Sequence, residues 1–396
     1  MNRGQLEKES ERWVKDGVIT SGQRVQILKR YEKKTGHPVL LTFAALFIGL
    51  GFLTFIASNW SALSDLVKMA IILFFLLVFY GTGAMLYQRR SKPVGLSFII
   101  IALCVFGAGI FLTGQMYHFT SFSAFPFLIW SLAGFGLLLV FKESILFLAT
   151  LVIVTAGQIY SGSTYQDFYI PLGLLFVAGL GWVLYKNGNR LLTGLFAISY
   201  VIQSMVFVFS YGWSYYWLIL LFLALYIVSH LPYGQLHLKT FGSIAVLSIF
   251  TLNLFQVFLL GYESEDVEYS NFFFLAWSIL FMYAVIQSAM ESTKFNWIDL
   301  VLFIPVFRIG AGDLLSLLLM FAYSLGWLLA GYRKEQPEWV MKGTLAFLIT
   351  TFVAYFQLAW AFMDRSIFFF TGGILLFILS YFLEKKRRQV KGGEPS

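Results

Sequence analysis

Arg308 and Asp313 are the two residues of this sequence whose types and spacing most favour a binding site. They flank Ile309-Gly310-Ala311-Gly312, at the end of a short apolar stretch, 297–308, that contains Pro305. Ionisable side chains within a membrane-spanning region are costly to bury and are usually functional. Arg308 would suit a carboxylate or another anionic group, with Asp313 as its resting partner or as a proton-coupling acid. The alternative is an exposed turn in which Asp313 caps the next helix.

A second polar group comes from two related sequences, Gly-Gln-Met-Tyr at 114–117 and Gly-Gln-Ile-Tyr at 157–160. If each ends an outgoing helix, their side chains would line the outer rim of one cavity, where a histidine could titrate near neutral pH. The alternative is structural, because tyrosine is common at membrane interfaces and a glutamine can hydrogen-bond a helix end. The candidates are Gln115, Tyr117, His118, Gln158 and Tyr160.

The elements that must position these residues are helices in a membrane. Of 396 residues, 59% are hydrophobic and only 12% are charged, and the mean hydropathy is +0.77. Soluble domains carry about 25% charged residues, so the composition excludes a separate soluble catalytic domain. Backbone groups in hydrocarbon must be paired within their own segment, which a helix achieves alone. The sequence therefore predicts an all-α polytopic membrane protein.

The apolar segments predict about 14 transmembrane helices, arranged as tandem helical hairpins. Each segment approaches the length of a span except 297–308. Even counted from 295, as about 14 residues, this pass would as a helix reach only about 21 Å across a core of about 30 Å. Short, proline-interrupted passes are typical of substrate sites in transporters. The segments are 39–58, 66–87, 94–114, 122–141, 143–161, 167–185, 190–209, 213–232, 239–261, 270–290, 297–308, 312–331, 339–362 and 366–383.

Basic residues predict that both termini lie in the cytoplasm. If the N-terminus is inside, only Lys68, Arg308 and Arg365 of the 28 Lys and Arg residues fall in outside loops. Positive charge is retained on the cytoplasmic face of a membrane. The net charge of +8 is therefore a signal of topology, and no nucleic-acid partner is expected.

The sequence predicts three parts: a cytoplasmic amphipathic helical tail at 1–37, a transmembrane helical domain at 38–384 and a basic cytoplasmic tail at 385–396. Within the first part, Gly17 would end one helix, and Thr20 or Ser21 would cap a second. A helical hairpin this short cannot bury a core alone. It must rest on the membrane domain or on lipid headgroups, bind a protein partner, or self-associate.

Several polar and small residues inside the apolar segments are expected to join helices. Ala133-Gly134-Phe135-Gly136 and Ala178-Gly179-Leu180-Gly181 would let neighbouring helices approach closely. Polar side chains such as Asn253 would hydrogen-bond between helices, as would Gln256, Gln287 and Gln357. Asp299, about one turn into the short pass, would meet Lys342 on the cytoplasmic side.

Three stretches carry a resemblance to a known family. They are Gly51-Phe-Leu-Thr-Phe-Ile-Ala-Ser-Asn-Trp60, Gly107-Ala-Gly-Ile-Phe-Leu-Thr-Gly-Gln-Met-Tyr-His118, and the ending from Asp364 to Arg388. They resemble a bacterial family of predicted integral-membrane proteins of unknown function with Ala-x-Asn-Trp and Gln-x-Tyr-His signatures. The resemblance covers roughly 5–160 and 339–390. It implies a multi-pass protein of the bacterial plasma membrane and implies no activity.

Three functions are left open by these patterns. The first is a transporter-like or lipid-handling protein that binds an amphipathic or anionic small molecule. The second is a membrane-embedded sensor or scaffold that anchors residues 1–37, whose Gly-Val-Ile-Thr turn is similar to short oligomerisation modules. The third is an intramembrane transferase. No phosphate-binding Gly-Lys-Ser/Thr and no His-Glu-x-x-His occurs in the sequence, so no cofactor or metal is expected; the expected partners include membrane lipids.

Overall fold

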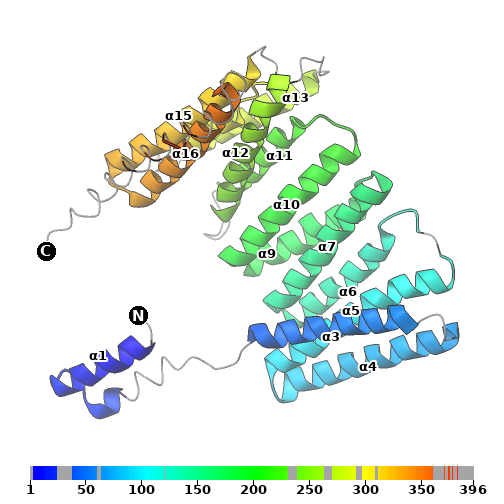
Figure 1. Ribbon diagram of the computed structural model, residues 1–396. Coiled ribbons are helices and arrows are strands. Elements are labelled where there is room, and N and C mark those ends of the chain that lie inside the picture. Colours follow the sequence, from blue (N-terminus) through cyan, green and yellow to red (C-terminus); the bar gives the residue numbers. More distant parts are fainter. Residues whose placement is uncertain are drawn as a thin grey trace. The chain divides into compact units, whose positions relative to one another are not determined.

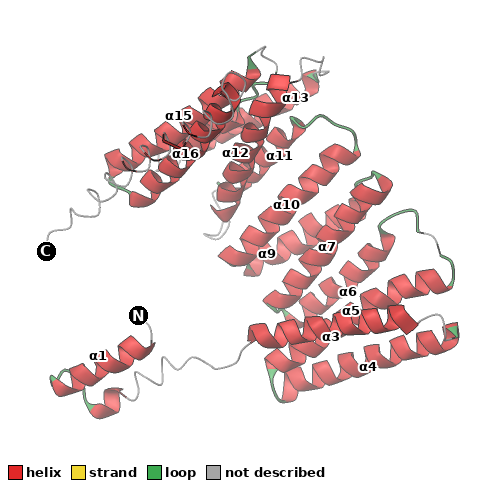
Figure 2. Ribbon diagram, in the orientation of Figure 1, coloured by secondary structure: helices red, strands yellow, loops and turns green. Residues whose placement is uncertain are grey.

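Helices make up the structure, which is a computed structural model (Figure 2). It describes residues 3–24, 38–59, 64–119, 121–230, 239–262, 270–290, 297–307 and 311–359, with positions 370, 373–374, 377 and 381. Among these residues there is no strand, and nine helices are long and apolar enough to cross a membrane. The prediction of an all-helical membrane protein is confirmed. The number of passes and the side on which the termini lie stay predictions.

The chain divides into two compact units, residues 1–113 and 114–396, whose elements Figure 1 labels. The first holds α1 (Arg3–Lys15), α3 (Pro38–Asn59), α4 (Asp65–Arg89) and most of α5 (Lys92–Met116). The second holds α6 (Phe125–Phe141), α7 (Ser144–Tyr165), α8 (Ile170–Leu174), α9 (Gly181–Asn187), α10 (Arg190–Ser210), α11 (Trp217–Ser229), α12 (Lys239–Tyr262), α13 (Asn271–Met290), α14 (Trp297–Leu300), α15 (Gly312–Lys334) and α16 (Pro337–Ala359). Each predicted segment from 39–58 to 339–362 overlaps helix, whereas most of 366–383 lies outside the described residues.

The N-terminal tail folds as its turn residues predict. Gly17 has a φ of 72°, and the N–H of Val18 donates to the carbonyl of Trp13 at 2.9 Å, which is how a left-handed glycine ends a helix. The N–H of Thr20 then donates to the Gln23 side chain at 2.9 Å, and the N–H of Gln23 donates to Thr20 Oγ1 at 3.3 Å. This reciprocal pair is a capping box, so Thr20 is confirmed as the N-cap.

Glycines let helices α4 and α5 approach closely on either side of an apolar core. A Cβ added to Gly83 would lie 2.9 Å from Ile99 Cγ1, and one added to Gly109 would lie 2.9 Å from Ile72 Cγ2. The contact later in α4, at Gly83, is with a residue earlier in α5, so the two helices are antiparallel. Ile72, Ile101 and Val105 form the buried core of this hairpin. Small residues at such interfaces let transmembrane helices approach closely.

In the second unit, α10 packs against α7 and against α12, and α12 also packs against α15. Thr155 Oγ1 on α7 lies 2.6 Å from Ser199 Oγ on α10. Phe196 on α10 in turn packs against Phe241 on α12, with ring centroids 6.0 Å apart. Consecutive helices such as α15 and α16 form the antiparallel hairpins that the sequence predicts.

The span Ile170–Asn187 contains a π-helical stretch, Leu175–Leu180, between α8 and α9. It includes most of the second Ala-Gly-x-Gly sequence. A Cβ at Gly179 would lie 3.3 Å from the ring of Phe135, which belongs to the first Ala-Gly-x-Gly sequence, so the two motifs meet. Gly136, by contrast, has nothing within 4 Å of its added Cβ. Only part of the repeated motif therefore makes the close approach predicted for it.

Candidate functional site

The short pass is a broken segment rather than a helix. It begins as α14, tightens into the 3-10 turn Val301–Phe303, and continues through Ile304, whose φ of −73° and ψ of 124° are extended. Pro305 follows, and a residue before proline is restricted to extended conformations. The sequence thus explains where the helix stops.

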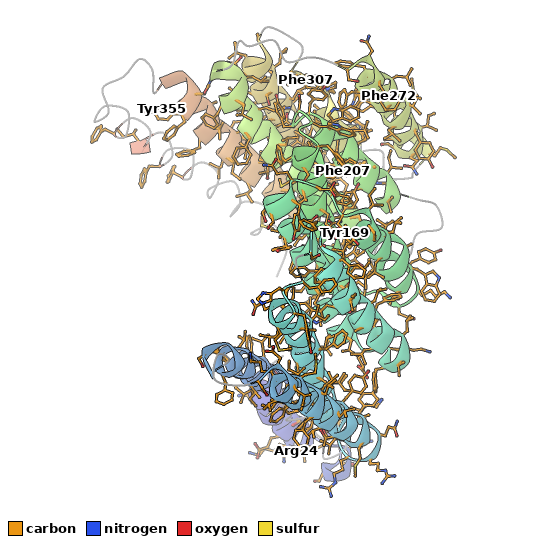
Figure 3. All side chains as sticks on the ribbon, turned by 90° about the vertical axis from the view of Figure 1, so that its right-hand side faces the viewer. Arg24, Tyr169, Phe207, Phe272, Phe307 and Tyr355 are labelled. Carbon is orange, nitrogen blue, oxygen red and sulfur yellow. The ribbon has the colours of Figure 1, made fainter. Side chains whose placement is uncertain are left out.

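The extended part lets this short segment advance much further than a helix would. The Phe303 ring packs on Tyr226 at 5.5 Å, and the Phe307 ring packs on Tyr216 at 4.5 Å. Tyr216 is the N-cap of α11, and Tyr226 lies near the other end of this helix, about 15 Å further along it. Four extended residues cover about 13 Å, whereas four helical residues cover about 6 Å. The segment therefore runs alongside most of α11, and Phe307 lies among aromatic side chains (Figure 3).

The backbone of the broken segment is paired by side chains from neighbouring helices. Asn253 Nδ2 on α12 donates to the carbonyl of Leu302 at 3.0 Å, and Trp277 Nε1 on α13 donates to the carbonyl of Phe303 at 2.9 Å. Ser316 Oγ on α15 has two acceptors for its one hydrogen, the Asn253 carbonyl at 3.0 Å and Asn253 Oδ1 at 3.1 Å. We call Asn253, Trp277 and Ser316 the carbonyl clasp. It meets the requirement that non-helical backbone at membrane depth be satisfied by protein.

A charged cluster lies at the α14 end of the segment. Lys342 Nζ on α16 lies 3.0 Å from Asp299 Oδ1, which also accepts a 2.7 Å hydrogen bond from Trp327 Nε1 on α15. The Lys342 ammonium stands 3.8 Å from the centroid of the Trp327 ring and 5.4 Å from that of Tyr323. We call these four residues the ammonium cage. The predicted contact between Asp299 and Lys342 is confirmed.

Glycines explain how three elements converge at the cage. A Cβ at Gly343 would lie 2.5 Å from the backbone nitrogen of Leu328, and one at Gly331 would lie 2.6 Å from that of Val340, so α15 and α16 touch along their backbones. Gly326 makes the corresponding approach to Ile298 of α14, at 2.9 Å. These contacts bring Lys342 within reach of a carboxylate on the far side of α15.

The structure locates one of the two candidates beyond the segment. Arg308 lies outside the described residues. Asp313 is the second residue of α15, half-buried, whereas Ala311 is the N-cap and makes no side-chain cap bond. The Asp313 carboxylate is therefore placed where a helix N-terminus favours negative charge. Its binding role stays a prediction.

The glutamine and tyrosine candidates have unlike environments. Gln158 is fully buried, and its amide both donates to the Tyr169 carbonyl at 3.0 Å and accepts from the Tyr169 N–H at 3.1 Å. It holds the start of α8, as the structural alternative predicts. Tyr160 packs on Phe127 at 5.3 Å. Three others are exposed and follow one another at the end of α5: Gln115, Tyr117 and His118.

Sequence reasoning missed most of the clasp and half of the cage. It took Asn253 as general interhelical glue and gave no role to Trp277, Ser316 or Trp327. A weak signal was present, because Asn253 and Gln256 are one turn apart and share a face of α12. Gln256 is 1% exposed, and its Nε2 has no hydrogen-bond partner in the described structure. The Gln256 side-chain amide is therefore a buried hydrogen-bond donor one helical turn after Asn253 on α12.

The comparisons with known proteins agree with the fold and leave the activity open. Residues 11–147 match a family described as predicted membrane protein (DUF2157). No curated protein and no solved structure matches the chain. The matched region reaches from α1 into α7, so the carbonyl clasp and the ammonium cage lie outside it. Within the described residues, no group of His, Cys, Asp and Glu could hold a metal ion.

Proposed function

We propose that this protein is a transporter-like membrane protein that binds a small amphipathic or charged molecule at the broken segment 297–307. The observation that supports this most is a helix that ends inside the bundle, with its last carbonyls, those of Leu302 and Phe303, held by side chains of neighbouring helices. Broken helices expose backbone groups and helix ends, which ligands use in transporters. A continuous helix offers no such groups, because its backbone is already paired.

The clasp also provides a way for the segment to rearrange. Each backbone bond that it makes is to a side chain, so the segment can release Leu302 or Phe303 without unwinding a neighbouring helix. Interhelical hydrogen bonds in membranes contribute only about 0.6 kcal/mol on average. Exchange of clasp bonds for ligand bonds is therefore energetically accessible.

We place the ammonium cage at the cytoplasmic end of the segment, and Arg308 and Asp313 at its outer end. This orientation rests on the distribution of Lys and Arg, which favours both termini on the cytoplasmic side of a bacterial plasma membrane. Charged groups at both ends of one crossing segment would meet a charged ligand on entry and on exit. The Gln115–His118 group would then belong to the outer surface.

Native mass spectrometry of the purified protein tests this proposal. We expect the wild type to retain a defined small molecule or lipid, and the Arg308→Ala, Asp313→Ala double variant to lose it. Leu318→Ala is the matched control, because Leu318 is 61% exposed on α15 and lies more than one helical turn along the sequence from Asp313. A wild type that is well folded and retains no such species would contradict the binding role.

The competing function is a scaffold or sensor that presents residues 1–37. It is favoured by the well-formed helix end at Gly17 and the capping box at Thr20, and by Val18, which is 71% exposed. Deleting residues 1–37 separates the two functions. A transporter keeps ligand retention without the tail, whereas a scaffold loses its cellular phenotype while the membrane domain still folds.

A further inference from the structure

We propose that Asp299, Trp327 and Tyr323 form a binding site for the primary ammonium group of a ligand, and that Lys342 occupies this site when the ligand is absent. The inference rests on the proposed function, whose ligand class it names. Lys342 thus serves as a built-in stand-in for the ligand.

The cage has the parts that recognise an ammonium group. A carboxylate oxygen lies 3.0 Å from the Lys342 nitrogen, at hydrogen-bond distance. The Trp327 ring faces the same nitrogen at 3.8 Å, and the Tyr323 ring adds a second aromatic face at 5.4 Å. Aromatic faces attract cations through their quadrupole, and Trp does so most strongly. The hydrogen bond to Asp299 selects an ammonium that carries N–H groups over a quaternary one.

The site is held in shape independently of Lys342. Trp327 Nε1 donates to Asp299 Oδ1 at 2.7 Å and so fixes the carboxylate against the ring. The Trp339 ring supports Trp327 at 5.3 Å, and the Phe250 ring supports Tyr323 at 5.8 Å. Removal of the lysine ammonium would therefore leave an ordered cation site.

Lys342 is also able to leave the cage. Its side chain is 38% exposed, whereas that of Asp299 is 12% exposed. A long lysine side chain can move its charge toward the aqueous interface while its stem stays on apolar surface. Both described hydrogen bonds to Asp299 end on Oδ1, so Oδ2 is a second acceptor for an arriving amine. One ammonium replaces another, and the buried carboxylate never lacks a counter-charge.

A second lysine provides a matched control. Lys186 on α9 stands 4.2 Å from the centroid of the Trp182 ring, a cation–π contact like that of Lys342. Lys186 is exposed, and within the described residues no carboxylate pairs with it. It shares the aromatic contact of the cage but not its carboxylate.

Thermal unfolding of the detergent-purified Lys342→Met protein tests the inference. Ethylammonium chloride should raise its melting temperature in a saturable way, by about 2 °C or more at ten times the dissociation constant. Sodium chloride at equal concentration should not, and neither should ethylammonium added to Asp299→Asn, Lys342→Met. In Lys186→Met, where Lys342 still competes for the cage, the rise should be smaller than in Lys342→Met. A folded Lys342→Met protein without an amine-dependent rise would overturn the inference, as would an equal rise in the double variant.

Should Lys342→Met fail to fold in plain buffer, purification in ethylammonium chloride becomes the test. Recovery of folded protein supports the cage, and recovery that is equal in sodium chloride contradicts it. If neither salt recovers it, native mass spectrometry on wild type and Asp299→Asn from nanodiscs containing phosphatidylethanolamine decides. Loss of a retained amine species in Asp299→Asn supports the cage, and unchanged retention or no retained amine in the wild type overturns it.

The same spectra distinguish the sources of the ammonium. A retained phosphatidylethanolamine identifies a lipid headgroup, and a retained small amine identifies a free solute. The two proposals also fail separately. If Lys342→Met binds ethylammonium but the wild type retains no ligand, the transport role alone is contradicted. A retained ligand that is insensitive to Asp299→Asn contradicts the cage alone.

Discussion

In the part of the second unit that the structure describes, two crossings depart from the regular α-helix, and they do so in opposite ways. The span 170–187 widens into a π-helical stretch but remains helical, and Phe176 stacks on Phe196 beside it with ring centroids 4.1 Å apart. The segment 297–307 abandons the helix after Phe303. The neighbours of segment 297–307 contribute an asparagine, a tryptophan, a serine and an ion pair. The π-helical stretch instead packs against the aromatic rings of Phe196 and Phe135.

The difference follows from where backbone hydrogen bonds go. A π-helical turn still pairs its own carbonyls, so its neighbours need only fill space. A helix that ends inside the bundle leaves its last carbonyls without partners in the same segment, so the neighbours must supply donors, as they do for Leu302 and Phe303. Polar residues such as Asn253 and Trp277 therefore mark the place where the helix ends inside the bundle.

The largest effect is expected from the clasp. Asn253→Leu leaves the Leu302 carbonyl without its side-chain donor, while the Ser316 hydroxyl keeps the backbone carbonyl of residue 253 as its acceptor. The change should lower the free energy of unfolding by about 1–3 kcal/mol. Gln158→Leu also removes two hydrogen bonds, but both are to the backbone of Tyr169 at the start of α8, and Tyr169 is only half-buried. It should cost about 1 kcal/mol. Equal losses in a denaturant titration in detergent would remove the distinction between the two crossings.

The ion pair should come next. Asp299→Asn leaves Lys342 without a counter-charge, and because Lys342 is partly exposed the cost should be about 1–2 kcal/mol. Adding Lys342→Met should recover about half of that cost, which a double-mutant cycle in detergent measures. Asp65→Asn is the control, since the Asp65 carboxylate is 51% exposed in its pair with Lys68. A cycle with no coupling would show that the pair does not stabilise α14.

Two glycines sharpen the comparison at the π-helical stretch. Gly136→Ala meets nothing within 4 Å and should gain about 0.5–1 kcal/mol from helix propensity. Gly179→Ala should gain nothing, because its Cβ would lie 3.0 Å from Leu175 and 3.3 Å from Phe135. Melting temperatures of the two variants check this. Equal stabilisation would mean that the π-helical stretch is not tightly packed.

The smallest effect is expected from Pro305→Ala. Proline reduces the freedom of the unfolded chain by about 0.4–1 kcal/mol, and the clasp should hold the extended conformation without it. Unfolding of this variant in denaturant should change by no more than that amount. A loss as large as that of Asn253→Leu would show that the proline, and not the side-chain clasp, keeps the segment broken.

Much of the fold could be predicted because it depends on local patterns. Apolar length located the helices, Gly17 and Thr20 located the turn in the tail, and the shortness of 297–308 together with Pro305 marked it as unusual. Asp299 and Lys342 could be paired because charges are rare in apolar segments, and each needs a partner.

The clasp and the partner of Gln158 could not be predicted, because they depend on how helices face one another. These helices are apolar on all sides, so hydrophobic periodicity does not show which face of α12 meets the broken segment. Asn253 and its partner Leu302 are 49 residues apart. The extended conformation after Phe303 was also missed, since a short apolar run looks alike as helix or as strand.

We propose above that segment 297–307 rearranges and becomes accessible from both sides of the membrane, unlike the helices around it. The most direct test is two-sided labelling of a cysteine with a membrane-impermeant thiol reagent, in a Cys104→Ser background that removes the single native cysteine. Val306→Cys reports on the segment, and Val257→Cys on α12 is the control; both valines are buried, at 2% and 0% exposure. Our account predicts labelling of Val306→Cys from both sides of the membrane and of Val257→Cys from neither. An unlabelled Val306→Cys in a folded protein would contradict it.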